Sequence, residues 1–192
     1  PSLYGKLNYD PIRDLAPIAR VASIQNIMLI HPSVPAKSLK EFIALARSNP
    51  GKLNFGSGGA GTTNHLASEI LKSLARIDMV HVPYKGSNQA MLGLIGGQVD
   101  MVVIAVPPAV PQIKAGKVRP LAVLSDERVS TLPDVPTAKQ AGVANFEVAV
   151  WYGILATGGT PREVITRLHG EIVKALAAPD VRERLLNAGI DP

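Results

Sequence analysis

Helix and strand signals alternate along this 192-residue chain, and that alternation constrains its fold more than any other feature. The apolar run over residues 99–106 is typical of a strand buried on both faces of a parallel sheet. Ser38 and Glu41 have the spacing of a capping box, and residues 160–163 combine a cap residue, a first-turn proline and a glutamate. The pattern predicts an α/β fold built from βαβ units with parallel-rich sheets flanked by helices.

The same signals give approximate bounds for the elements. The expected strands cover residues 15–30, 52–55, 79–84, 99–106, 120–125 and 146–156. Expected helices run from 38 to 49, from 62 or 63 past 74, from 87 to 96, within 110–114, from 160 to 178 and from 180 to 187. In the second helix Leu66, Ile70 and Leu74 share one face by their spacing. Pro107 and Pro108, together with Pro111, are interpreted as a rigid link and not as a PxxP ligand.

Composition excludes several classes of protein. Hydrophobic residues make up 46% and charged residues 18%, which is enough to bury a core. Aromatic residues are only 4%, so a base-stacking platform for single-stranded nucleic acid is not expected. The net charge of +5 is dispersed and gives only a mild bias toward acidic partners. No apolar run approaches the length of a membrane span, and the first residues resemble neither a signal peptide nor a start, so we expect an interior piece of a longer protein.

The residue types of common metal sites are missing or scattered. There is no cysteine, which excludes thiolate metal sites and disulfides. The four histidines lack HExxH or HxH spacing. We therefore predict neither a metal nor a cofactor.

A glycine-rich loop, Gly56-Ser57-Gly58-Gly59-Ala60-Gly61, satisfies the pattern G-x-G-x-x-G between a strand and a helix. This is the spacing of a Rossmann-like dinucleotide fingerprint, which would make the chain part of an enzyme. The strand before the loop is short and carries Asn54, and the next strand ends at Lys85 where ribose recognition needs an acidic residue. The dinucleotide interpretation is therefore kept only as an alternative.

The same loop suits an anion better. Its glycines let successive backbone N–H groups converge beside the positive end of a helix dipole. Ser57, Thr62 and Thr63 add hydroxyl donors, and His65 follows one turn into the helix. The alternatives are a plain strand-to-helix turn with Thr62 as the N-cap, and a structural histidine.

Further candidates lie near the ends of other strands. Tyr84 and Lys85 follow a strand at the edge where open α/β sheets bind ligands, and Lys85 is either a partner for a distal carboxylate or a solvated lysine. Trp151, the only tryptophan, is either a cleft floor or a core residue.

A catalytic triad is the remaining enzyme hypothesis. Ser57, His65 and Asp78 would be its members, but Phe55 stands where a G-x-S-x-G elbow needs glycine. We therefore predict no catalytic residue.

Several segments resemble one family of proteins. Residues 54–66, NFGSGGAGTTNHL, resemble the segment N-Y/F-G-S-x-G-x-G-[ST]-x-x-H-L of the Bug/TctC receptors, the periplasmic components of tripartite tricarboxylate transporters. Residues 81–87, HVPYKGS, are similar to their H-V-P-Y-[KR]-G segment. Further matches occur in the same order at residues 1–4, 9–11, 31–35, 96–100, 113–117 and 132–137, so the resemblance covers essentially the whole chain.

The resemblance implies a two-lobed periplasmic binding protein fold of type II-like architecture. Residues 24–149 would form the second lobe, and residues 1–23 and 150–192 part of the first, with the family's N- and C-terminal segments absent from this chain. It implies a monomeric, extracytoplasmic receptor without enzymatic activity that captures a small organic carboxylate for a membrane permease. A receptor used for signalling stays open as an alternative.

The family's receptors hold a carboxylate with one loop from each lobe, and residues 57–63 are similar to the second-lobe loop. Ile104-Ala105 replaces an Asp-Asn pair that relatives often carry, which suggests an apolar pocket wall. The predicted ligand-binding residues are Ser57, Gly58, Gly59, Ala60, Gly61, Thr62, Thr63, His65, Tyr84 and Lys85.

Overall fold

In the computed structural model, which describes residues 7–187 and residue 190, the chain divides into two compact units. We call Gln25–Val150 the central unit, and the described residues of 1–24 and 151–192 the terminal unit. Strands β1 (Leu15–Ile30) and β6 (Ala149–Thr157) pair with each other and contribute residues to both units. Helices and strands alternate as predicted, which confirms the α/β class.

The sheet of the central unit is mixed. Its strand order is β3-β2-β4-β1-β5, with β2 at Asn54–Ser57, β3 at Val80–Pro83, β4 at Met101–Ala105 and β5 at Arg119–Val123. Strand β2 runs parallel to β3 and β4, as predicted, whereas β1 is antiparallel to both β4 and β5. The expectation of parallel sheets was wrong for β1, because an apolar run shows that a strand is buried but not which way its neighbours point.

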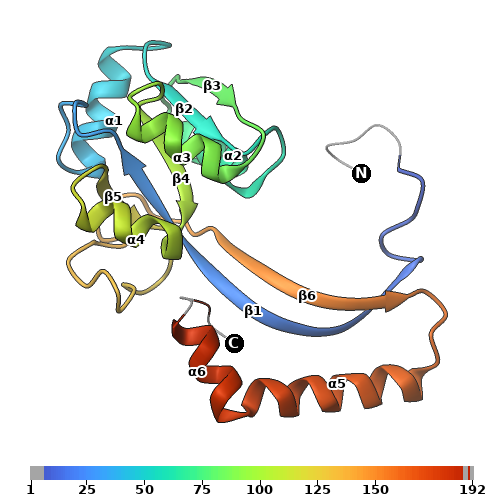
Figure 1. Cartoon of the computed structure of the whole chain (residues 1–192). Helices are drawn as coiled ribbons and strands as arrows, with labels where there is room; N and C mark the ends of the chain where they lie inside the picture. The colour runs from blue at the N-terminus through green and yellow to red at the C-terminus, as the bar shows by residue number, and fades with distance from the viewer. Residues whose placement is uncertain (1–6, 188–189, 191–192) are drawn as a thin grey trace. The chain divides into compact units, whose positions relative to one another are not determined.

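Helices cover both faces of this sheet (Figure 1). Because side chains alternate along a strand, Met28 and Ile30 of β1 enter one core and Ile27 and Leu29 the other. Helices α1 (Leu39–Ser48) and α2 (Thr63–Ala75) pack into the first core. Helices α3 (Ser87–Ile95) and α4 (Val106–Lys114) pack into the second. The central unit is therefore layered helix, sheet, helix.

The predicted capping box of α1 is half confirmed. The Glu41 N–H donates to the Ser38 hydroxyl at 3.2 Å, as expected. The Glu41 carboxylate, however, accepts from the N–H of Lys37 at 2.7 Å instead of that of Ser38. The Glu41 side chain therefore bonds to Lys37, the residue before the N-cap, and not to the N-cap itself.

Two other helices differ from the sequence prediction. Leu66, Ile70 and Leu74 do share a face of α2, but that face is exposed, and the helix buries Ala67 and Leu71 instead. The proposed rigid link at Pro107-Pro108 was wrong, because these prolines form the first turn of α4, where a missing N–H costs nothing.

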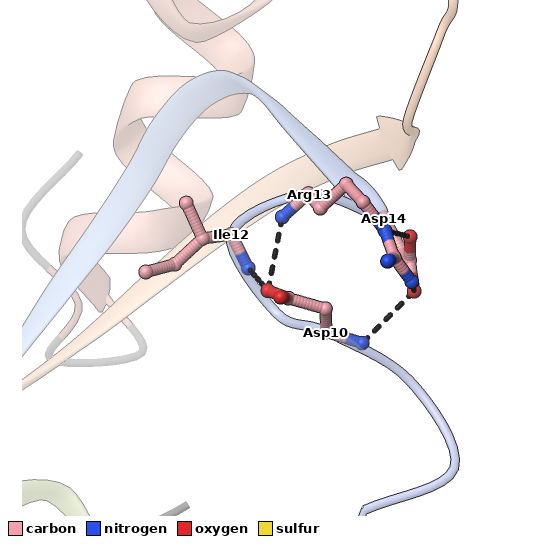
Figure 2. Close-up of polar contacts among 4 residues, drawn as sticks. All are labelled: Asp10, Ile12, Arg13 and Asp14. Atoms are coloured by element: carbon pink, nitrogen blue, oxygen red, sulfur yellow. Dashed lines mark hydrogen bonds and ion pairs between the residues drawn. The ribbon is translucent and has the colours of Figure 1, made fainter.

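The terminal unit contains the first part of β1, most of β6, and helices α5 (Arg162–Ala177) and α6 (Pro179–Asn187). Its chain enters β1 through an aspartate turn (Figure 2). The Asp10 carboxylate accepts from the N–H groups of Ile12 at 2.9 Å and Arg13 at 3.1 Å, and the Asp10 N–H donates to Asp14 at 2.9 Å. The Arg13 guanidinium, and then the Asp10 N–H, hold the pKa of Asp14 below its usual value. Among the described residues no helix combines the length and apolar character needed to cross a bilayer.

Gly158, just after β6, packs against this turn. Its N–H donates to the Asp14 carbonyl at 2.7 Å, and a β-carbon there would overlap the carbonyl oxygen of Arg13. We expect Gly158→Ala to lower the free energy of unfolding by about 1–3 kcal/mol, because the clash is with backbone. Gly170→Ala in α5 is the matched control, since nothing lies within 4 Å of its added methyl. Denaturant unfolding in which both variants behave alike would contradict the prediction.

Candidate functional site

The loops after β2 and β3 meet at one edge of the central sheet. Ser57 at the end of β2 is in register with Pro83 at the end of β3, and the Tyr84 N–H donates to the Ser57 carbonyl at 2.9 Å. The carboxyl ends of parallel strands are where open α/β sheets bind ligands. The structure therefore places the glycine-rich loop beside Tyr84 and Lys85, as the sequence predicted.

The Ser57 and Thr62 hydroxyls are used inside the loop. Ser57 is fully buried, and its Oγ donates to the Gly59 carbonyl at 3.2 Å while accepting from the Gly59 N–H at 3.1 Å. The Thr62 hydroxyl donates to the same carbonyl at 2.7 Å and makes no side-chain cap bond to α2. The Thr62 hydrogen is therefore directed to the Gly59 carbonyl, whereas the Ser57 hydrogen has two acceptors within reach, this carbonyl and Nε2 of His81 at 2.6 Å. Direct contact of these hydroxyls with a ligand stays a prediction.

Backbone geometry explains the glycines. Gly59 has φ 120° and Gly61 has φ 79°, values that residues with a β-carbon rarely adopt. At Gly58 a β-carbon would lie 2.9 Å from the backbone nitrogen of Ser87, at the start of α3. The loop therefore needs glycine both to turn and to pack against the neighbouring segment.

Asn64 joins the loop to α3, a role that the sequence analysis missed. Its Oδ1 accepts from the Gly58 N–H at 3.4 Å, its Nδ2 donates to the Ser87 hydroxyl at 3.0 Å, and it is only 8% exposed. The available signal was spacing, because Asn64 falls on the same face of α2 as the buried Ala67 and Leu71. A polar residue on an apolar face needs partners, and here the loop supplies one.

Several donors of the loop remain open. Within residues 7–187, no protein acceptor pairs with the Thr63 hydroxyl or with the backbone N–H groups of Ala60, Thr63, Asn64 and His65. The last three N–H groups belong to the first turn of α2, which leaves its N–H groups unpaired and carries the positive end of the helix dipole. This arrangement can bind a carboxylate or another small anion without a charged side chain.

Two histidines and a phenylalanine stack beside the loop. The ring centroid of His81 lies 4.9 Å from that of Phe55 and 4.2 Å from that of His65. His65 Nδ1 accepts from the Gly61 N–H at 3.2 Å, and His81 Nε2 lies 2.6 Å from Ser57 Oγ. Burial, together with nearby His65, lowers the pKa of the His81 imidazole. The two imidazoles therefore contact the loop at Ser57 and at Gly61.

The Ser57–His81 contact has the spacing of a nucleophile and its base, but Ser57 has no exposed surface for a substrate to reach. The triad considered from sequence is not assembled as written, since Ser57 meets His81 and not His65. Asp78 instead contacts Gly51 through its backbone carbonyl at 3.2 Å. Among the described residues, no group of His, Asp and Glu side chains is arranged to hold a metal ion.

The remaining predicted residues differ in their surroundings. Tyr84 is half-buried, its ring lies over Gly93 of α3, and its hydroxyl donates to Gln98 at 3.3 Å. Lys85 is exposed. Trp151 is 63% exposed on β6, so it is not a core residue of the described chain. The apolar pocket wall suggested at Ile104-Ala105 is not formed by Ile104, which is only 3% exposed and packs inside the second core, whereas Ala105 is half-buried.

Comparison with known proteins identifies the family. The sequence model for the tripartite tricarboxylate transporter family receptor, TctC, matches residues 1–192. The chain belongs to the TctC receptor family. It is 42% identical over 188 residues to a UPF0065 protein in the tcbD-tcbE intergenic region of Pseudomonas sp. (strain P51), covering 97% of this chain but 56% of that protein. This chain thus spans little more than half the length of that curated TctC relative.

Solved structures confirm the fold. R. palustris Rpa4515 with adipate matches with a TM-score of 0.89 at 33% identity, covering 99% of this chain and 64% of that one. MatC (Rpa3494) from Rhodopseudomonas palustris with bound malate matches with a TM-score of 0.86 at 34% identity, covering 98% and 64%. Both the resemblance to TctC receptors and the periplasmic binding protein fold predicted from sequence are confirmed.

The contacts of Asn64 lead to a stability prediction for this TctC chain. Asn64→Ala leaves the half-buried Gly58 N–H without its acceptor and removes the bond to the Ser87 hydroxyl, so we expect a loss of about 1–3 kcal/mol in the free energy of unfolding. Asn88→Ala is the control, because Asn88 is an exposed asparagine on α3. Urea unfolding of the two variants checks this, and equal stabilities would show that the Asn64 contacts contribute nothing.

Proposed function

We propose that the full-length protein is an extracytoplasmic receptor of the periplasm that captures a small organic carboxylate and presents it to the membrane permease of a tripartite tricarboxylate transporter. Membership of the TctC family supports this proposal. So do the ligands of two structural relatives, adipate in Rpa4515 and malate in MatC, both of which are carboxylates. The observation that carries it is the group of unpaired N–H donors in the first turn of α2, next to the glycine-rich loop.

The proposed binding groups are mainly backbone. The N–H groups from Ala60 to His65 that lack protein acceptors, together with the Thr63 hydroxyl, would hold the carboxylate. Ser57, Gly58, Gly59, Gly61 and Thr62 would act by shaping the loop. A hydrogen bond to a charged group contributes about 1.5–3 kcal/mol, so a few such bonds suffice for micromolar binding. Tyr84 and Lys85 would border the site, with Lys85 available to a distal carboxylate.

The units suggest how the receptor is organised. We infer that the central unit corresponds to the second lobe expected at residues 24–149, and the terminal unit to part of the first. The role of the protein in uptake is favoured over signalling by the family to which it belongs. We propose that it works as a monomer and without catalysis, and the buried hydroxyl of Ser57 supports the second point.

Substitutions in the loop test this function in the full-length protein. Gly58→Val would push the loop away from Ser87, and Thr62→Val would remove a bond that fixes the Gly59 carbonyl. We expect each to weaken binding of adipate or malate by about 1–3 kcal/mol in calorimetry. Thr166→Val in α5 is the matched control, because it removes the same kind of hydroxyl-to-carbonyl bond elsewhere.

Native mass spectrometry of the purified full-length protein would first identify any ligand that it carries. The proposal fails if neither Gly58→Val nor Thr62→Val changes the affinity for that ligand. It also fails if the wild-type protein binds no carboxylate.

A further inference from the structure

We propose that Ser87, in the first turn of α3, is a further ligand-binding residue, and that its hydroxyl donates to the carboxylate held at the first turn of α2. This inference deepens the proposed function of the glycine-rich loop and rests on it. It starts from the hydrogen bonds of Asn64, whose side chain joins the loop to Ser87.

Helices α2 and α3 begin at the same edge of the central sheet but lie on opposite faces of it. Strands β2 and β3 are parallel neighbours, and each is followed by one of these helices. Helix α2 packs into the first core and α3 into the second. Open α/β sheets bind ligands where neighbouring parallel strands send their helices to opposite faces, at the carboxyl ends of those strands. The topology therefore puts the first turns of both helices at the edge where a ligand is expected.

Close contacts join the two first turns. A β-carbon at Gly58 would lie 2.9 Å from the backbone nitrogen of Ser87 and 3.1 Å from its Oγ. The backbone N–H of Asn64 is one of the unpaired donors of α2, and the Nδ2 of the same residue lies 3.0 Å from Ser87 Oγ. Ser87 is half-buried, so it keeps surface that a ligand can contact, whereas Ser57 is fully buried.

The bonds of Asn64 determine where the Ser87 hydrogen can go. A backbone N–H can only donate, so the side-chain atom of Asn64 that meets the Gly58 N–H is the acceptor Oδ1. The other end of the amide is then Nδ2, which can only donate, and it donates to Ser87 Oγ. Ser87 therefore accepts from Asn64 and keeps its own hydrogen. Within residues 7–187, no protein acceptor takes that hydrogen.

The start of α3 favours negative charge for the same reason as the start of α2. Its N-cap is Gly86, which has no side chain that could cap the helix. Among the described residues, no acceptor pairs with the N–H groups of Ser87, Asn88 and Gln89. The positive end of the α3 dipole therefore lies beside the Ser87 hydroxyl.

A carboxylate can use both helices at once. Its two oxygens share the negative charge, so one can accept from the N–H groups of α2 while the other accepts from the Ser87 hydroxyl. Only the side chain of Asn64 and one hydrogen bond separate these two sets of donors. Ser87 would thus contact the carboxylate group itself, whatever body is attached to it.

Calorimetry of the full-length protein with adipate and with malate tests this in Ser87→Ala. We expect the affinity for each ligand to fall by about ten- to a hundredfold, which corresponds to the loss of a hydrogen bond to a charged group. The factor should be similar for the two ligands, because a carboxylate is what they share. Ser73→Ala is the matched control, since Ser73 is an exposed serine in the last turns of α2, and it should bind as the wild type does.

A double-variant cycle separates contact with the ligand from support of Asn64. If Ser87 only held the Asn64 side chain, Ser87→Ala would change nothing in a protein that already carries Asn64→Ala. We expect instead that Ser87→Ala lowers the affinity of the Asn64→Ala protein by a similar factor. Should Asn64→Ala not fold, a crystal structure of the wild type with adipate decides. Ser87 Oγ should then lie about 2.5–3.0 Å from an oxygen of the carboxylate held by α2.

The outcomes are distinguishable. Unchanged affinity in Ser87→Ala, or no further loss in the Asn64→Ala background, overturns the inference and leaves the proposed function intact. A loss confined to one of two ligands that the wild type binds does the same, as does a crystal structure in which the carboxylate does not contact Ser87. A wild-type protein that binds no carboxylate overturns both.

Discussion

The backbone carbonyl and N–H of Gly59 determine the conformation on which the candidate site depends. Its carbonyl accepts from the Ser57 and Thr62 hydroxyls and from the Thr62 N–H, and its own N–H donates to Ser57. Because that carbonyl accepts from Ser57 and Thr62, it does not accept from the Thr63 N–H, which would be its partner in a longer helix. The N–H groups in the first turn of α2 have no protein acceptor and are left for water or an anion.

The rest of the central unit holds this loop in place. The end of β2 is bonded to the residue after β3, and Asn64 bonds the loop to the start of α3. The glycine at position 58 lets the two segments approach more closely than a side chain would allow. The first turn of α2 is thus fixed between two loops on a buried sheet, and little ordering entropy is left for a ligand to offset.

Much of this could be predicted from sequence, and the failures have common causes. The α/β class, the extent of β1 and the loop beside Tyr84 followed from periodicity and from glycine spacing. The direction of β1 and the hydrogen-bond partners of the Ser57 and Thr62 hydroxyls could not be predicted. Both depend on contacts between residues whose proximity does not follow from their spacing in the sequence. The Ser57–His81 contact could not be predicted either, because it depends on the register between β2 and β3, which no sequence motif specifies.

A site of uncharged donors has a consequence for specificity. Backbone N–H groups recognise the carboxylate itself and make no distinction among the bodies attached to it, whereas a buried arginine would select by bidentate geometry and charge. Two relatives of this chain hold adipate and malate, which share carboxylates but differ in length and in hydroxylation. In the proposed function, a backbone cradle of this kind would accept carboxylates with different bodies, and side chains outside it, such as the exposed Lys85, would select the remainder of the molecule.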